Sequence, residues 1–140
     1  MIPFAQELIF NCKIAFARFI SEDVFIVTFR DSDKPVTLDE YKELHEGCLS
    51  MIGDRKVVSL VDLRGKRVYF SKEARQFASK SSRLNEHRLA EAILVDNSAI
   101  QIAANFYLKI FKPPIPSKVF RNEEVASQWL GMQLNAILNH

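Results

Sequence analysis

Residues 57–64 read VVSLVDLR, a short apolar run that ends in an acid and a base, and after a brief connection residues 71–75 read SKEAR. A continuous apolar strand rich in β-branched residues needs cover on both faces, as in a parallel sheet flanked by helices. The segment at 71–75 has the composition of a helix start. Open α/β folds bind ligands and partners at the carboxyl ends of such strands. The stretch therefore predicts an α/β fold and indicates where a site would lie.

The length and composition predict one globular domain. The chain has 140 residues, of which 48% are hydrophobic and 26% are charged. We expect residues 1–140 to fold as a single domain that buries roughly two-thirds of its unfolded surface without disulfides or metals. No apolar run approaches the roughly 18 residues of a membrane-spanning helix, and residues 1–13 lack the pattern of a secretory signal. We therefore expect a cytoplasmic protein without a membrane span.

The cysteines and histidines do not form a recognisable metal or redox pattern. Cys12 and Cys48 lack CxxC spacing, which favours buried, unreactive thiols over a redox pair. His45, His87 and His140 have no metal-ligand spacing with them. The chain also has no GxGxxG and no P-loop. We therefore expect neither a metal site nor a cofactor.

Basic residues are concentrated in the middle of the chain. Residues 1–63 carry 7 basic and 11 acidic side chains, and residues 89–140 carry 4 of each. Between them, residues 64–88 carry 8 basic side chains against 2 acidic ones. This block coincides with the connection after the apolar strand and with the helix that follows. It suits either a phosphate or an acidic partner, or a plain solvated helix face.

The first part of the chain predicts a hairpin and a helix. Two runs of β-forming residues, 13–20 and 24–30, are separated by only three residues, which is typical of an antiparallel hairpin. Residues 37–40, TLDE, form a capping box, and apolar residues at helical spacing continue to Gly53.

Three further strand and helix pairs follow. A strand at 56–63 leads to a helix capped by Ser71, whose inward face continues to Leu84. The remaining predicted elements are a strand at 91–96, a helix from Asn97 to Phe111, a strand at 118–121 and a helix capped by Asn122. The predicted order is ββαβαβαβα in a single-domain mixed β-sheet, with right-handed crossovers between the parallel strands.

This order and several of its segments resemble the SpoIIAA-like branch of the STAS and CRAL-TRIO-like families, which are small bacterial proteins mostly of unassigned function. The resemblance covers essentially the whole chain. It is carried by residues 61–64, 71–75, 92–95 and 105–113, by Phe120 with the acidic start of the last helix, and by residues 129–130. It implies a STAS-like (SpoIIAA-like) fold.

The resemblance also implies a candidate regulatory site. In anti-anti-sigma STAS proteins a serine at the start of the second helix is phosphorylated, and Ser71 falls near that position. A phosphate there would be stabilised by the helix N-terminus and by nearby basic side chains. The candidate phospho-acceptor or partner site comprises Ser71, Asp62, Arg64, Arg67, Lys72 and Arg75. The local sequence lacks the acid and glycine of the family's phosphoserine loop, which favours an ordinary N-cap serine at this position.

The third predicted helix has too broad an apolar surface for a single sheet to cover. Its polar residues form one narrow stripe, and nearly all other positions are apolar. The remaining apolar surface would meet neighbouring helices, a second subunit or an apolar ligand. We expect Phe106, Tyr107 and Phe111 to belong to this self-association or ligand surface.

The sequence argues against catalysis and against nucleic-acid binding. Asp62, Asp96 and Ser71 would gather at the carboxyl edge of the sheet, but no histidine is placed near these turns to act as a base. The basic block lacks interleaved exposed aromatic residues. We expect a non-catalytic protein-interaction or regulatory module with a protein partner or a homodimer. The alternative is a small-molecule or lipid-binding domain that uses the apolar third helix.

Overall fold

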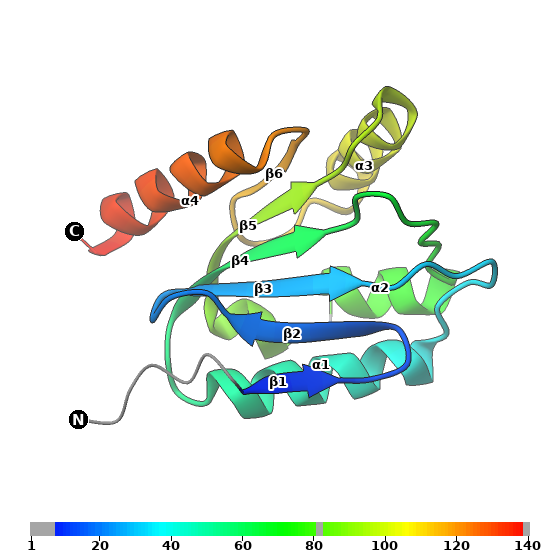
Figure 1. Ribbon diagram of the computed structural model, residues 1–140, viewed down its shortest axis with the longest axis horizontal. Helices are drawn as coiled ribbons and strands as arrows, with labels where there is room; N and C mark the ends of the chain where they lie inside the picture. Colours follow the sequence, from blue (N-terminus) through cyan, green and yellow to red (C-terminus); the bar gives the residue numbers. More distant parts are fainter. Residues whose placement is uncertain (1–7, 81–82, 139–140) are drawn as a thin grey trace.

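The computed structural model describes residues 8–80 and 83–138, with only the backbone at Phe111 and Leu138. These residues form one six-stranded sheet and four α-helices (Figure 1). The strands are β1 (Ile9–Asn11), β2 (Ala15–Phe19), β3 (Val24–Phe29), β4 (Val57–Asp62), β5 (Arg88–Leu94) and β6 (Ser117–Phe120). The helices are α1 (Leu38–Ile52), α2 (Lys72–Lys80), the 3-10 turn η1 (Arg83–Glu86), α3 (Ser98–Phe111) and α4 (Glu123–Leu138).

The strands lie in the sheet in sequence order, β1 to β6. β1, β2 and β3 pair in antiparallel fashion, and β3, β4, β5 and β6 pair in parallel. The α/β class and the mixed single sheet predicted from the sequence are therefore confirmed. The structure adds β1, a three-residue edge strand that the sequence analysis did not predict, because so short a run carries no alternation signal.

Side chains at the helix starts explain where the helices begin. The Thr37 hydroxyl accepts the Glu40 N–H, and the Glu40 carboxylate accepts the Thr37 N–H, so the predicted capping box is formed. Asn97 caps α3 and Asn122 caps α4 in the predicted way. These caps fix the directions in which the helices leave the sheet.

The second predicted helix is shorter than expected. α2 ends at Lys80, and Leu84 lies in the separate turn η1. Ser81, which falls within the predicted span of this helix, lies outside the described residues. β5 also begins earlier than predicted, at Arg88 instead of Glu91.

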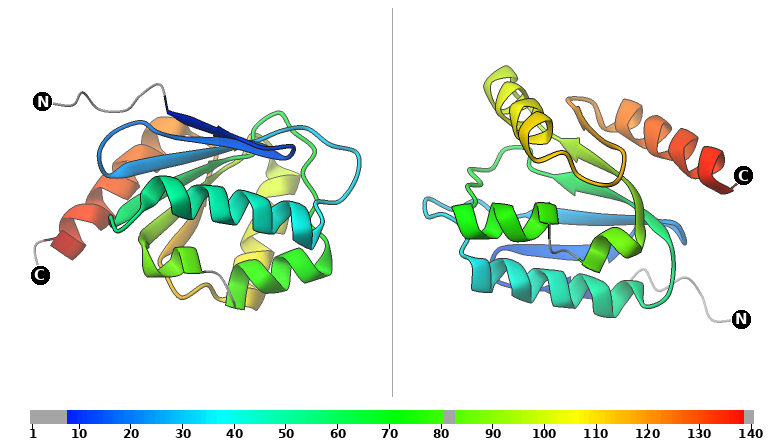
Figure 2. Two further views of the ribbon diagram at one scale, coloured as in Figure 1. Left: turned by 90° about the horizontal axis from the view of Figure 1, so that it is seen from below. Right: turned by 180° about the vertical axis from the view of Figure 1, so that it is seen from behind.

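The helices cover the two faces of the twisted sheet unequally (Figure 2). One face carries Phe25, Val27 and Phe29 of β3 and packs with α1 in one apolar cluster. The opposite face carries Leu60, Ala92 and Leu94 and packs with Ala126 and Leu130 of α4 in another. No helix in the described part of the chain is long and apolar enough to cross a membrane.

Candidate functional site

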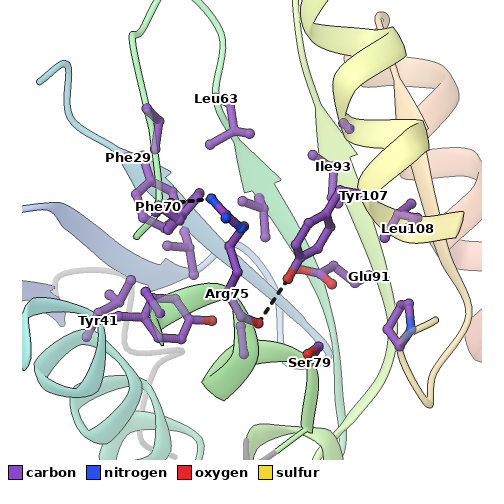
Figure 3. Close-up of a pocket in the computed structure, with 18 of the residues that line it drawn as sticks. Phe29, Tyr41, Leu63, Phe70, Arg75, Ser79, Glu91, Ile93, Tyr107 and Leu108 are labelled. Carbon is purple, nitrogen blue, oxygen red and sulfur yellow. Dashed lines mark hydrogen bonds between the residues drawn. The ribbon is translucent and has the colours of Figure 1, made fainter. Parts of the chain in front are cut away.

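A cavity of about 290 Å³ lies on the sheet face opposite α4, among α1, α2 and α3. Its floor is a row of neighbouring strand residues, Val27, Val61 and Ile93, which the parallel register places side by side. The walls come from all three helices and from the connection between β4 and α2, and most are apolar. Among the wall residues are Phe29, Leu44, Leu63, Phe70, Ala74, Ala104 and Leu108 (Figure 3).

An ion pair between Arg88 and Glu91 forms part of the lining. One guanidinium nitrogen of Arg88 lies 3.0 Å from a carboxylate oxygen of Glu91, and the two side chains are only 11% and 16% exposed. A second Arg88 nitrogen donates to the Asn85 side-chain oxygen at 2.7 Å. Nε of Arg88 is buried and has no hydrogen-bond partner among the described residues.

A break in the strand register explains how these two side chains reach one face. Residues three apart on a regular strand point to opposite faces. Here Val57 pairs with Arg88 and Val58 pairs with Ala90, so Leu89 is an extra residue in β5. This β-bulge turns Arg88 to the side of the sheet that Glu91 faces. The sequence analysis missed both residues because strand alternation alone gives no sign of a bulge.

Two tyrosines bring hydroxyl groups to the same cavity. Tyr107 of α3 donates its hydroxyl hydrogen to the backbone oxygen of Arg75 at 3.4 Å, which links α3 to α2 (Figure 3). Tyr41 of α1 also lines the cavity, and its hydroxyl makes no hydrogen bond with the described residues. Burial raises the pKa of both phenols, so both stay protonated at neutral pH and can donate.

The residues of the predicted phospho-acceptor site have different hydrogen-bond partners. The Ser71 hydroxyl accepts the Ala74 N–H at 3.1 Å, so this residue is the N-cap of α2 that the sequence pattern favoured. Lys72 is exposed on the outside of the helix. Arg75 turns instead to the cavity, where its guanidinium donates to the Phe70 carbonyl at 2.6 Å.

Half of the eight basic side chains at 64–88 are paired with acids among the described residues, namely those of Arg64, Arg67, Arg83 and Arg88. Arg64 makes two bonds of 3.0 Å to the Asp62 carboxylate and one of 2.8 Å to Glu123. Burial acts to raise the pKa of Asp62, but the hydrogen bonds from Arg64 outweigh it and hold the pKa below its ordinary value.

Arg67 pairs with Asp31 at 2.8 Å, and its hydrogen bonds lower the pKa of the Asp31 carboxyl to about 2. The sequence gives the summed charge of the block but not its pairing with Asp31 and Glu123, which are distant in sequence.

The predicted surface on α3 divides between two faces. Phe106 is 63% exposed and points away from the cavity, whereas Tyr107 lines it. Consecutive helix residues lie about 100° apart, so they do not share one narrow face. The exposed neighbours of Phe106 are Ile102 and Ile110, one turn away on each side. The side chain of Phe111 lies outside the described residues.

The remaining candidate groups fit structural roles. Cys48 is buried, as predicted, and burial raises the pKa of its thiol to about 12. Cys12 is half-buried, with its sulfur 3.4 Å from the Ala15 carbonyl oxygen. Asp96 accepts the Gly65 N–H at 2.8 Å and so fixes the connection between β4 and α2. No group of three or more His, Cys, Asp or Glu side chains in the described residues could hold a metal ion.

Comparison with solved structures shows the class of fold. An uncharacterised protein of the DUF3478 family with a SpoIIAA-like fold, from Shewanella loihica PV-4, superimposes with a TM-score of 0.58 and 16% sequence identity. The match covers 87% of this chain and 90% of that one. The chain therefore has a SpoIIAA-like α/β fold, as the sequence resemblance implied.

The family follows from the sequence itself. Residues 18–133 match the model of a domain of unknown function, DUF7793, and the chain belongs to that family. No curated protein matches the chain.

Proposed function

We propose that this protein binds a small, mostly apolar molecule in the cavity beneath α1, α2 and α3. The observation that carries the proposal is the cavity itself, about 290 Å³ in volume and lined by apolar side chains with a few converging polar groups. Ligand sites generally have this composition. The volume is about twice that of the ~150 Å³ cavity known to hold benzene, so a ligand with one or two rings fits. In this role the protein is a binding domain and not an enzyme.

A cavity-filling variant tests the proposal. Ala104 lines the cavity from α3, whereas Ala99 is exposed on the same helix. We expect naphthalene-2-carboxamide to raise the thermal midpoint of the wild-type protein, because a ligand that binds only the folded state stabilises it. Ala104→Leu should remove this response, and the matched control Ala99→Leu should keep it.

Two results would contradict the proposal. One is a wild-type protein whose thermal midpoint does not change with a panel of one-ring and two-ring neutral probes. The other is an Ala104→Leu variant that responds to the probe as the wild type does, since the probe would then bind elsewhere.

The outer face of α3 supports a second function. In this role the protein is a cytoplasmic interaction module that pairs with another copy of itself. Ile102, Phe106 and Ile110 are spaced four residues apart and are 69%, 63% and 56% exposed. Such an apolar stripe on a soluble domain is typical of an interaction site. The basic block supports a charged partner less well, because Arg64 and Arg67 already have acidic partners.

The oligomeric state tests this second function. If the stripe pairs two copies, light scattering at high micromolar concentration should give twice the chain mass, and Phe106→Asp should give the single mass. The Glu124→Gln variant, changed at an exposed position of α4, is the control that should stay paired. A wild-type protein that stays monomeric at this concentration contradicts it.

A further inference from the structure

The charges that line the cavity do not cancel. The lining contains two guanidinium groups, from Arg75 and Arg88, and one carboxylate, from Glu91. Arg88 and Glu91 neutralise each other at 3.0 Å. Arg75 has no carboxylate within 4.0 Å among the described residues, so one positive charge is left over on a mostly apolar surface. An uncompensated charge beside apolar surface is costly and favours an incoming group of opposite sign.

The bonding of Arg75 leaves most of its donors available. A guanidinium carries five N–H donors, and Arg75 uses one of its nitrogens to bind the Phe70 carbonyl. This bond holds the side chain over the cavity, beside Phe70 and Leu63 (Figure 3). Arg64 and Arg67, which lie close by in sequence, instead use their guanidinium groups on carboxylates of this chain. Arg75 is thus distinguished by lacking an acidic partner within the described residues.

Tyr41 adds a neutral donor to the lining of the cavity. The Tyr41 hydroxyl lines the cavity and makes no hydrogen bond with the described residues. Burial keeps this phenol protonated, so it can donate to an oxygen of a ligand but carries no charge that would repel it. Both Arg75 and Tyr41 can therefore bind an oxygen-bearing group.

We propose that the ligand of this cavity is a small apolar carboxylate, whose hydrocarbon body lies on Val27, Val61 and Ile93 and whose carboxylate binds the guanidinium of Arg75. The proposal rests on the binding function proposed above. One surplus positive charge matches one carboxylate, whereas a phosphate monoester carries nearly two negative charges. A planar guanidinium also binds a carboxylate through two parallel hydrogen bonds.

Paired probes of the same shape test the proposal. Naphthalene-2-carboxylate and naphthalene-2-carboxamide differ mainly in charge, and their affinities for the full chain can be measured by titration calorimetry at pH 7.5. We expect the carboxylate to bind at least tenfold more tightly. Arg75→Gln should reduce this ratio to near one, mainly because the carboxylate binds more weakly. Lys72→Gln, which removes an exposed positive charge from the same helix turn, should preserve the ratio.

The outcomes separate this proposal from the binding function on which it rests. If the wild type binds both probes equally, the carboxylate preference is wrong and the binding function stands. If the wild type binds neither probe, both are wrong. A preference that survives Arg75→Gln overturns the assignment to Arg75. Circular dichroism confirms that each variant is folded, and the wild-type comparison of the two probes is decisive without any variant.

Discussion

The two faces of the sheet are covered by helices in different ways, and β5 shows the difference most directly. Toward α4, β5 presents Ala90 and Ala92, which pack with Ala126 and Leu130. Toward α1, α2 and α3, the same strand presents Glu91 and Ile93, which line the cavity. None of the α4 side chains that the structure describes lines it.

Side-chain size differs between the two faces of the sheet. Alanines let a helix approach a sheet closely, and α4 packs directly on the sheet through Ala126 and Leu130. On the other face, the ring of Phe70 contacts the rings of Phe29 and Tyr41 edge to face. The ring centroids are 5.4 Å apart for Phe29 and 6.1 Å apart for Tyr41. Helix α2 contacts both α1 and α3, and a space remains between these helices, the rings and the Arg88–Glu91 pair. The cavity therefore lies on the face that carries the larger apolar cluster, and α4 packs on the face with the smaller one.

The largest expected effect comes from breaking the ion pair on the cavity face. Glu91→Leu leaves the mostly buried Arg88 guanidinium without its carboxylate, which typically costs about 3–5 kcal/mol of unfolding free energy. Urea denaturation at pH 7.5 measures the loss. Replacing both partners, as in Arg88→Met with Glu91→Leu, should restore much of it, because no unpaired charge then remains. A double variant as unstable as Glu91→Leu alone would show that the unpaired charge of Arg88 does not cause the loss of stability.

The next largest expected effect is a difference in the loss of stability when a leucine is truncated on each of the two faces. Leu130 of α4 is only 1% exposed where α4 packs on the sheet, so Leu130→Ala should cost about 3 kcal/mol. Leu108 of α3 borders the existing cavity and is half-buried, so Leu108→Ala should cost about 1 kcal/mol. Urea midpoints compare the two directly. Equal losses would mean that the cavity face packs as solidly as the α4 face, contrary to the comparison above.

The fold could be predicted largely from local patterns. The strand at 57–62 was predictable because a continuous apolar run needs two covered faces, and α1 because its capping box is a short-range signal. The edge strand β1 was not, because its pairing with β2 depends on tertiary contacts that three residues do not encode. The end of α2 at Lys80 was missed because apolar spacing continues to Leu84 across the break.

The site was predictable only in fragments. Arg75 and Tyr107 were singled out, but for a basic patch and an apolar surface, not for a common cavity. Arg88 and Glu91 reach the cavity through a bulge that leaves no sequence signature. The acids that neutralise Arg64 and Arg67 include Glu123 and Asp31, which are distant in sequence. Net charge along the chain therefore overstated the charge available to a partner.

A smaller effect is expected when the N-caps of α2 and α4, helices on opposite faces of the sheet, are removed. Ser71 accepts the Ala74 N–H at the start of α2, and Asn122 accepts the Val125 N–H at the start of α4. Replacing either by alanine should cost about 1 kcal/mol. Because α2 has nine residues and only Ala74 buried, Ser71→Ala should also speed amide exchange throughout α2. Asn122→Ala should affect only the first turn of the longer α4. Exchange rates that change equally along both helices would contradict this difference.

The smallest expected effect is a loss of stability at mildly acidic pH. It arises from His45, which lines the cavity. Burial lowers the pKa of this histidine, with Arg83 and Arg88 acting in the same direction and Glu46 opposing them. Below pH 6.5 the unfolded chain therefore takes up a proton that the folded chain resists, so stability should fall as the pH drops from 6.5 toward the lower folded-state pKa. Urea midpoints at pH 7.5, 6.5 and 5.5 should decline for the wild type and for His87→Gln, and decline less for His45→Gln. If His45→Gln declines as steeply as the wild type, the loss arises elsewhere and the cavity face is not the acid-sensitive side of the sheet.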